Sequence, residues 1–260
     1  MQTPAPAPLR SSELSSFLLA PNPGPMSLDG TNSYLLSAPG AQGLVVVDPG
    51  PADEGHLQAL ASAGKVELVL ITHRHPDHTE GSVRFAELTG APVRALDPEY
   101  CVNGKPLEDG EEITAGGVRI RVVATPGHTS DSVCFLLPDD GPAGAVLTGD
   151  TILGRGTTVL DWPDGTLADY LHSLDVLDRL GPATVLPAHG PVLPNLSSVV
   201  LTYRDHRTER LAQIKAALEH AGPDATAEQV ADLVYADVPA NVRAAAELSV
   251  AAQLEYLRSR

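Results

Sequence analysis

The stretch that decides the fold is Thr-His-Arg-His-Pro-Asp-His at residues 72–78, directly after the apolar run Val-Glu-Leu-Val-Leu-Ile-Thr at 66–72. It carries three imidazoles and a carboxylate close together, at His73, His75, Asp77 and His78. Such a group is expensive to remove from water unless something cationic binds it. Imidazole nitrogens and carboxylate oxygens suit zinc, and they also suit iron and manganese. The stretch therefore predicts a metal site at the end of a β-strand.

Three further polar motifs follow later strand-like runs of the chain. They are Pro-Gly-His-Thr, Thr-Gly-Asp and Pro-Ala-His-Gly, which contribute His128, Asp150 and His189. A single His or Asp at a strand end is usually a turn or cap residue. Strand ends that meet at one edge of a sheet, however, can assemble a site from distant segments. All four motifs in this order therefore indicate one shared site.

The pattern of apolar residues predicts an α/β protein. Short runs that are mostly β-branched and end in Gly, Pro or Asp are typical of strands, and they lie at 43–48, 66–72, 91–96, 118–124, 132–137, 145–149 and 183–187. Segments with apolar residues at helical spacing lie at 54–64, 81–90 and 166–181. The nearly continuous apolar runs are typical of strands covered on both faces, so we expect two packed sheets with helices outside.

The pattern changes after the last predicted strand. Residues 195–222 form one long helical stretch, and 240–260 predict a final helix. Between them, Thr226 and Gln229 have the capping-box spacing that begins a helix. We therefore divide the chain into a flexible N-terminal arm at 1–14, a main domain at 15–195 and a C-terminal helical extension at 196–260.

The motif set resembles the pattern of the metallo-β-lactamase superfamily, whose members are two-metal hydrolases with an αββα fold. The resemblance covers about residues 15–195, and Asp-Pro-Gly at 48–50 matches a further element of the family. It implies that one metal is held by His73, His75 and His128. It implies that a second metal is held by Asp77, His78 and His189, with Asp150 bridging the two. Every ligand position of the two-metal pattern is filled, which indicates a working site.

The expected chemistry follows from that ligand set. Two divalent ions bridge a water molecule and lower its pKa toward neutrality, and the resulting hydroxide attacks a carbonyl carbon or phosphorus. Asp77 binds a metal and also accepts a proton from the nucleophile, so it is the predicted catalytic residue. Zinc is the first choice for both ions, with iron and manganese as alternatives.

Three residues are candidates for contact with the substrate. Arg155 lies in a Gly-rich loop shortly after Asp150, where its guanidinium can pair with a carboxylate or phosphate. His206 and Arg207 lie in the predicted long helix, in a segment that resembles a signature of one branch of the superfamily. That branch includes endoribonucleases and thioesterases that release polyketides. The alternative for His206 is a partly exposed position on a charge-rich helix face.

Members of this branch also carry a C-terminal winged-helix-like domain, which residues 223–260 resemble. A winged helix continues with two short strands after its last helix, whereas this chain stops directly after the last predicted helix. We therefore expect a helical extension without a wing. The missing wing weighs against nucleic-acid binding by this extension.

Charge and composition favour a small-molecule substrate. The chain has 33 Asp and Glu against 17 Lys and Arg, a net charge of −16, which argues against a broad surface for nucleic acid or anionic membrane. It shows neither a signal-peptide pattern nor an apolar run of membrane-spanning length, so we expect a cytoplasmic protein with no membrane partner. The first hypothesis is a dinuclear hydrolase that uses a metal-bridging hydroxide on a small thioester, ester or lactone. The alternative is a metal-dependent endoribonuclease that acts on single-stranded RNA.

Overall fold

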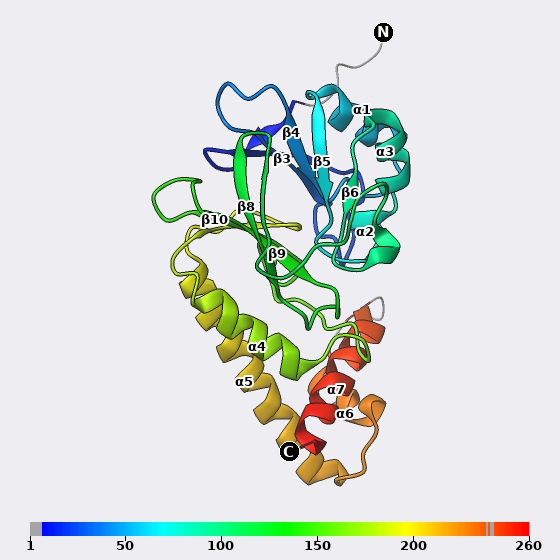
Figure 1. The fold of residues 1–260 in the computed structure, drawn as a ribbon. Helices are drawn as coiled ribbons and strands as arrows, with labels where there is room; N and C mark the ends of the chain where they lie inside the picture. Colours follow the sequence, from blue (N-terminus) through cyan, green and yellow to red (C-terminus); the bar gives the residue numbers. More distant parts are fainter. Residues whose placement is uncertain (1–6, 238, 240–241, 260) are drawn as a thin grey trace.

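The computed structural model describes residues 7–237, 239 and 242–259 of the chain, and its strands form two sheets (Figure 1). The first sheet has the order β1-β2-β3-β4-β5-β6, with bounds Leu9–Arg10, Ser15–Leu19, Asn32–Leu36, Leu44–Val47, Val66–Leu70 and Val93–Arg94. The second has the order β11-β10-β9-β8-β7, with bounds Thr184–Pro187, Ala145–Gly149, Val133–Leu137, Val118–Ala124 and Glu112–Ala115.

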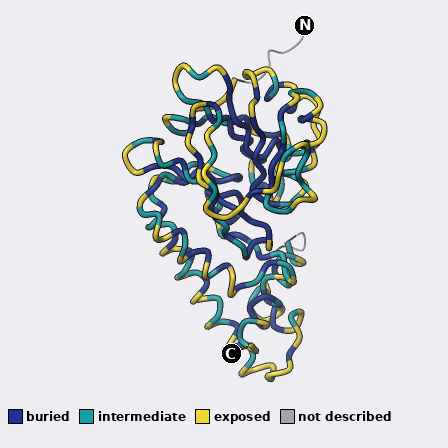
Figure 2. The backbone as a smooth tube through the Cα atoms, in the orientation of Figure 1, coloured by how far each residue is buried: buried dark blue, intermediate teal, exposed yellow. Residues whose placement is uncertain are grey.

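The two sheets pack face to face, and helices cover both outer faces. Val47 and Leu70 of the first sheet meet Phe135 and Leu147 of the second in a central apolar layer. Helices α1 (Glu54–Ser62) and α3 (Ser82–Thr89) cover the first sheet, while α4 (Leu167–Asp178) and α5 (Leu196–Ala221) cover the second. The backbone of both sheets is mostly buried, as Figure 2 shows. The predicted αββα sandwich is therefore confirmed.

All seven predicted strands are present, but four others, β1, β2, β3 and β7, were not predicted from the apolar pattern. Strand β7 alternates between exposed and half-buried residues, because it lies at the edge of its sheet and its outward side chains are polar. Strand β2 begins with two serines and buries only two of its five residues. Neither strand has the continuous apolar run that marks a covered strand. The structure also has a short helix α2 (Pro76–Thr79) and a 3₁₀ turn η1 (Pro98–Tyr100).

One edge of the sandwich collects the predicted motifs. Strands β10 and β11 run parallel, and β8 has the same direction because both β8 and β10 pair antiparallel with β9. The carboxyl ends of these three strands therefore lie at the same edge and lead to Asp150, His189 and His128. Strand β5 ends at Leu70 and leads into the segment that holds His73. The topology thus brings four distant segments to one place.

The C-terminal extension is helical. Helices α6 (Ala227–Val234) and α7 (Arg243–Arg258) pack on the second half of α5 through a small apolar cluster that includes Ile214, Val230 and Val250. The predicted capping box of Thr226 and Gln229 is present. After β11, the described part of the chain contains helices and no strand. Helix α7 also contacts α4, which attaches the extension to the main domain (Figure 1).

The N-terminal segment corrects one expectation. Leu9 and Arg10 form strand β1, which pairs with β2, and Ser12 Oγ donates to Asp140 Oδ2 at 2.5 Å. Residues 9–14 are therefore attached to the main domain rather than forming a flexible arm, and residues 1–6 lie outside the described residues. The pairing of β1 with β2 is local, whereas the contact with Asp140 joins residues 128 positions apart, which the composition of the N-terminal segment does not indicate. Among the described helices, none is both long enough and apolar enough to cross a membrane.

Candidate metal centre

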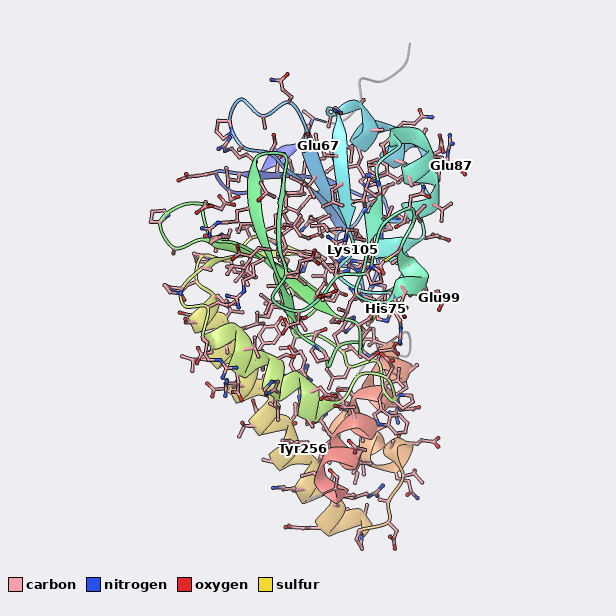
Figure 3. The ribbon with its side chains drawn as sticks, in the orientation of Figure 1. Glu67, His75, Glu87, Glu99, Lys105 and Tyr256 are labelled. Atoms are coloured by element: carbon pink, nitrogen blue, oxygen red, sulfur yellow. The ribbon has the colours of Figure 1, made fainter. Side chains whose placement is uncertain are left out.

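The structure brings all seven predicted ligand residues together in two adjacent groups. The first group contains His73, His75, His128 and Asp150, and the second contains Asp77, His78 and His189. Within each group the ligand atoms lie within 4.8 Å of one another. The labelled His75 marks the position of the groups, at the edge of the sheets that faces the helical extension (Figure 3).

The first group is formed by three imidazoles that converge on one point. His75 Nδ1 lies 3.0 Å from His73 Nε2 and 3.1 Å from His128 Nε2. Asp150 Oδ2 lies 3.8 Å from His128 Nε2. Three nitrogens and one oxygen at these separations are the donor set of a tetrahedral divalent ion.

The second group faces the other oxygen of the same aspartate. Asp150 Oδ1 lies 3.3 Å from His189 Nε2 and 3.7 Å from His78 Nε2. Asp77 Oδ2 lies 3.2 Å from His189 Nε2 and 3.6 Å from His78 Nε2. Asp150 therefore directs one carboxylate oxygen to each group, which is the arrangement that a bridging ligand requires.

Unpartnered buried atoms show that the residues fit a bound cation. His78 Nε2, His189 Nε2 and Asp150 Oδ1 are buried, and none of them has a hydrogen-bond partner. Leaving such groups unpaired costs about 1–3 kcal/mol each. All three point toward the same space between the imidazoles and the carboxylates. A divalent ion there would accept lone pairs from all three atoms once any proton on the imidazoles has left.

The nitrogens of the imidazoles that face away from the centre are also held. His128 Nδ1 donates to the carbonyl of Val159 at 2.6 Å, and His189 Nδ1 donates to the carbonyl of Gly30 at 3.1 Å. His73 Nδ1 lies 3.1 Å from Thr72 Oγ1. Hydrogen bonds of this kind fix the tautomer and ring orientation of a metal-binding histidine. The rings are therefore oriented before any ion arrives.

Asp48 holds the segment 72–78 in place through hydrogen bonds. Its carboxylate accepts from Thr72 N at 2.8 Å, from Thr72 Oγ1 at 2.7 Å and from His78 Nδ1 at 2.8 Å. The residue is 2% exposed and has φ of 53°, a left-handed conformation that aspartate tolerates better than most residues. The Asp-Pro-Gly element is thus a support for the ligands as well as a turn.

Asp161 is a support that the sequence analysis missed. Its Oδ2 lies 3.3 Å from His75 Nε2 and also accepts from the Arg74 guanidinium, which pairs with Asp164 as well. Asp161 lies in Leu-Asp-Trp-Pro-Asp-Gly, more than 80 residues after His75, and no motif marks it. Only the fold brings the two side chains together.

The pKa values differ between the two groups. Burial lowers the pKa of His128 to about 4 and that of His73 well below its usual value, so both imidazoles offer free lone pairs. Burial also opposes a charge on His189, but Asp150 and Asp77 outweigh it and raise the pKa of His189 to about 11. The pKa of His78 is raised as well, because Asp48, Asp77 and Asp150 together outweigh its burial. In the metal-free chain His189 of the second group therefore holds a proton at neutral pH.

This difference predicts proton release on metal binding. An ion in the second group would displace the proton of His189, so the apparent affinity should fall by about tenfold per unit as the pH is lowered from 8 to 6. The check is calorimetric titration of the metal-free protein with Zn²⁺ in buffers of different ionisation enthalpy. A metal affinity that does not change between pH 6 and pH 8 would contradict the assignment.

Comparison with known proteins agrees with this geometry. Residues 26–189 match the family model of the Metallo-beta-lactamase superfamily, which covers more than half of the chain. The chain belongs to the metallo-beta-lactamase superfamily. The C-terminal residues 226–260 match the Beta-lactamase associated winged helix domain. The protein is thus a metal-dependent hydrolase of this superfamily, and the histidines and aspartates of its motifs lie where such a hydrolase needs ligands for divalent metals.

Several metallo-beta-lactamase relatives are similar over most of their length. The Beta-lactamase-like protein 2 homolog of Caenorhabditis elegans is 34% identical over 253 residues, which cover 92% of this chain and 82% of that protein. The Atrochrysone carboxyl ACP thioesterase of Aspergillus fumigatus is 33% identical over 245 residues, which cover 86% of this chain and 74% of the enzyme.

Solved structures of the superfamily also match this fold. A metallo-beta-lactamase family protein of Thermus thermophilus, TTHA1429, has a TM-score of 0.77 and 26% identity, covering 94% of this chain and 93% of that one. TTHA1623, solved in a di-iron-bound form, has a TM-score of 0.55 and 27% identity, covering 69% of this chain and 94% of that one.

The structure places the predicted substrate residues in different surroundings. Arg155 is half-exposed and pairs with Asp29 on the loop before β3. Arg207 is 2% exposed, donates from Nη2 to the carbonyl of Thr158 at 2.6 Å and stacks on Tyr170. His206 is partly buried and lies near this segment. Contact with substrate remains a prediction for all three residues.

Proposed function

We propose that the protein is a dinuclear metal-dependent thioesterase. One observation carries the proposal, namely that the two oxygens of Asp150 face two separate groups of buried donors, several of which have no partner. In this proposal the first ion binds His73, His75 and His128. The second binds Asp77, His78 and His189, and Asp150 bridges both.

When bound, the two ions would supply Lewis-acid activation of a water molecule and stabilise the negative charge that develops on the attacked carbonyl oxygen. Asp77 supplies the base. Burial raises its pKa, but His78 and His189 outweigh that effect and lower the pKa to about 2, so the carboxylate is ionised at neutral pH. Its side chain is 31% exposed, whereas His78 and His189 are fully buried. Asp77 is therefore the acidic ligand that an incoming water and substrate can reach.

The leaving group favours a thioester over an ester or lactone. Three buried tyrosines donate their hydroxyls to backbone carbonyls, so these hydroxyls are already engaged and do not serve as acids for a leaving group: Tyr34, Tyr170 and Tyr203. A thiol has a pKa of about 8.5, so a thiolate can depart without prior protonation by a strong acid. Hydrolysis of a thioester therefore needs Asp77 as the base but no separate general acid for the leaving group. The similarity to an ACP thioesterase supports the same substrate class.

The metals and partners follow from the same proposal. We assign zinc to both positions because the donors are mainly imidazole nitrogens, and iron is the alternative that the di-iron relative supports. The net charge of −16 supports a small-molecule substrate rather than RNA. Cys101 and Cys134 are both free, which fits a reducing compartment, and we propose the cytoplasm.

A side-by-side assay tests the proposal. The metal-loaded protein is offered an N-acetylcysteamine thioester, a p-nitrophenyl ester and a short single-stranded RNA, each with and without a chelator. We expect chelator-sensitive hydrolysis with the highest kcat/KM on the thioester. Chelator-sensitive cleavage of RNA without acyl hydrolysis would replace the thioesterase by an endoribonuclease.

A further inference from the structure

A pocket of about 260 Å³ lies between the main domain and the C-terminal helices. One wall is the segment 157–159, a second is Met26 on the loop before β3, and the others come from α5 and α7. Met26 is 52% exposed, so the pocket is open at this side. The pocket is therefore formed only when the helical extension packs on the main domain.

The walls of this pocket also support the metal ligands. Val159 lines the pocket, and its carbonyl accepts from His128 Nδ1 at 2.6 Å. Met26 belongs to the loop that leads to Gly30, whose carbonyl accepts from His189 Nδ1 at 3.1 Å. Two segments thus border the pocket and hold one metal ligand each, so the pocket lies beside the metal centre.

The pocket is positively charged in a strongly acidic protein. Arg207 and Arg210 of α5 line it, and none of the described residues that line it is acidic. Neither arginine forms an ion pair with a described carboxylate, whereas Arg204 on the same helix pairs with Asp175. Among the described residues, Arg210 donates to His206 Nε2 at 3.4 Å and Gln213 Oε1 at 2.7 Å and lies over the ring of Tyr235. Two guanidinium charges without counter-charges favour an anion.

Unpartnered donors in the pocket wall point to the same kind of ligand. Arg207 is 2% exposed, and its Nε is buried without a hydrogen-bond partner among the described residues. His206 Nε2 accepts from Arg210 Nε, so the proton of the neutral ring is on Nδ1, which is also buried and unpartnered. Both groups are donors. A ligand that satisfies them must bring acceptor oxygens.

We infer that this pocket binds a carboxylate at the far end of a short acyl group whose thioester is hydrolysed at the metal centre. The inference rests on the proposed thioesterase function and names its substrate class. The carboxylate oxygens would accept from Arg210 and from the donors around Arg207 and His206. The aliphatic part of the acyl group would lie against Met26 and Val159. The small volume suits a short chain with one anionic end.

The first test compares two substrates of equal size that differ only in charge. They are the N-acetylcysteamine thioesters of glutaric acid and of its monoamide, assayed with wild type, Arg210→Gln and the matched control Arg204→Gln. Wild type and Arg204→Gln should prefer the acid by at least about tenfold in kcat/KM, and Arg210→Gln should reduce that preference to about twofold or less. Equal rates on both thioesters in wild type, or an unchanged preference in Arg210→Gln, would overturn the inference.

The second test separates the pocket from the proposed activity. Glutarate and inorganic phosphate are titrated calorimetrically into the metal-loaded wild type and both variants. Binding of either anion to the metals is common to all three proteins, so a loss of glutarate affinity of about fivefold or more in Arg210→Gln alone reports the pocket. If glutarate affinity is lost in Arg210→Gln alone but the protein does not hydrolyse thioesters, the anion pocket is supported and the thioesterase function is contradicted. Phosphate binding that is tighter than glutarate binding and sensitive to Arg210→Gln would overturn the carboxylate assignment.

Discussion

Replacing Asp77 with asparagine should lower kcat by about 10²–10⁴-fold, the usual range for loss of a general base. The amide keeps the size of the carboxylate and one oxygen near His189, but it no longer accepts a proton from the attacking water. Asp77 Oδ2 lies 3.2 Å from His189 Nε2, and the pKa of about 2 keeps it ionised at neutral pH. Thioester turnover at saturating substrate measures the effect.

The matched control for Asp77→Asn is Glu80→Gln, which removes an exposed carboxylate three residues further along the same turn. The control should keep wild-type turnover. Metal content and thermal melting are measured for both variants, so that loss of an ion or of the fold is recognised. If Asp77→Asn keeps its metals and turns over at the wild-type rate, the assignment of Asp77 as the base is wrong.

Asp48→Ala should have the second largest effect, and it should act on stability and metal binding together. The carboxylate accepts three hydrogen bonds from Thr72 and His78 while being 2% exposed. Removing it leaves three buried donors unpaired, and we expect the free energy of unfolding to fall by about 3–5 kcal/mol. The orientation of His78 is lost as well, which should lower metal affinity by about 10–100-fold. Urea unfolding and competition with a chelator measure the two effects.

Asp48→Asn is the matched variant at this position. Asparagine tolerates the left-handed backbone conformation and keeps one acceptor oxygen, so it should lie between wild type and Asp48→Ala in both measurements. A cost below about 1 kcal/mol for Asp48→Ala, together with unchanged metal affinity, would show that the three hydrogen bonds do not support the site.

The ligands could be predicted from the sequence because their chemistry is local. His73, His75, Asp77 and His78 follow a single strand, and the other three ligands each follow a strand at the same edge of the sandwich. The strand-like runs are marked by continuous apolar residues, which result from burial on both faces. The edge strand β7 lacks this signal because its outward residues are polar.

The supports and the pocket could not be predicted because they depend on contacts between distant segments. Asp161 lies 86 residues after His75, and no residue spacing in the sequence indicates that the two side chains meet. Arg207 was a substrate candidate by resemblance, yet its guanidinium donates to the carbonyl of Thr158 on a loop of the main domain. Arg210 gave no signal of its own, because the pocket that it lines also needs distant residues from the segment 157–159 and from α7.

Metal analysis coupled to thioester hydrolysis shows whether the enzyme needs two metal ions for turnover. The purified protein is stripped with a chelator and titrated with Zn²⁺, while bound metal per chain and turnover are measured on the same samples. We predict that turnover is lost on stripping, returns with added zinc and reaches its maximum at about two ions per chain. Full turnover at less than one ion per chain, or turnover that survives stripping, would contradict the two-metal account.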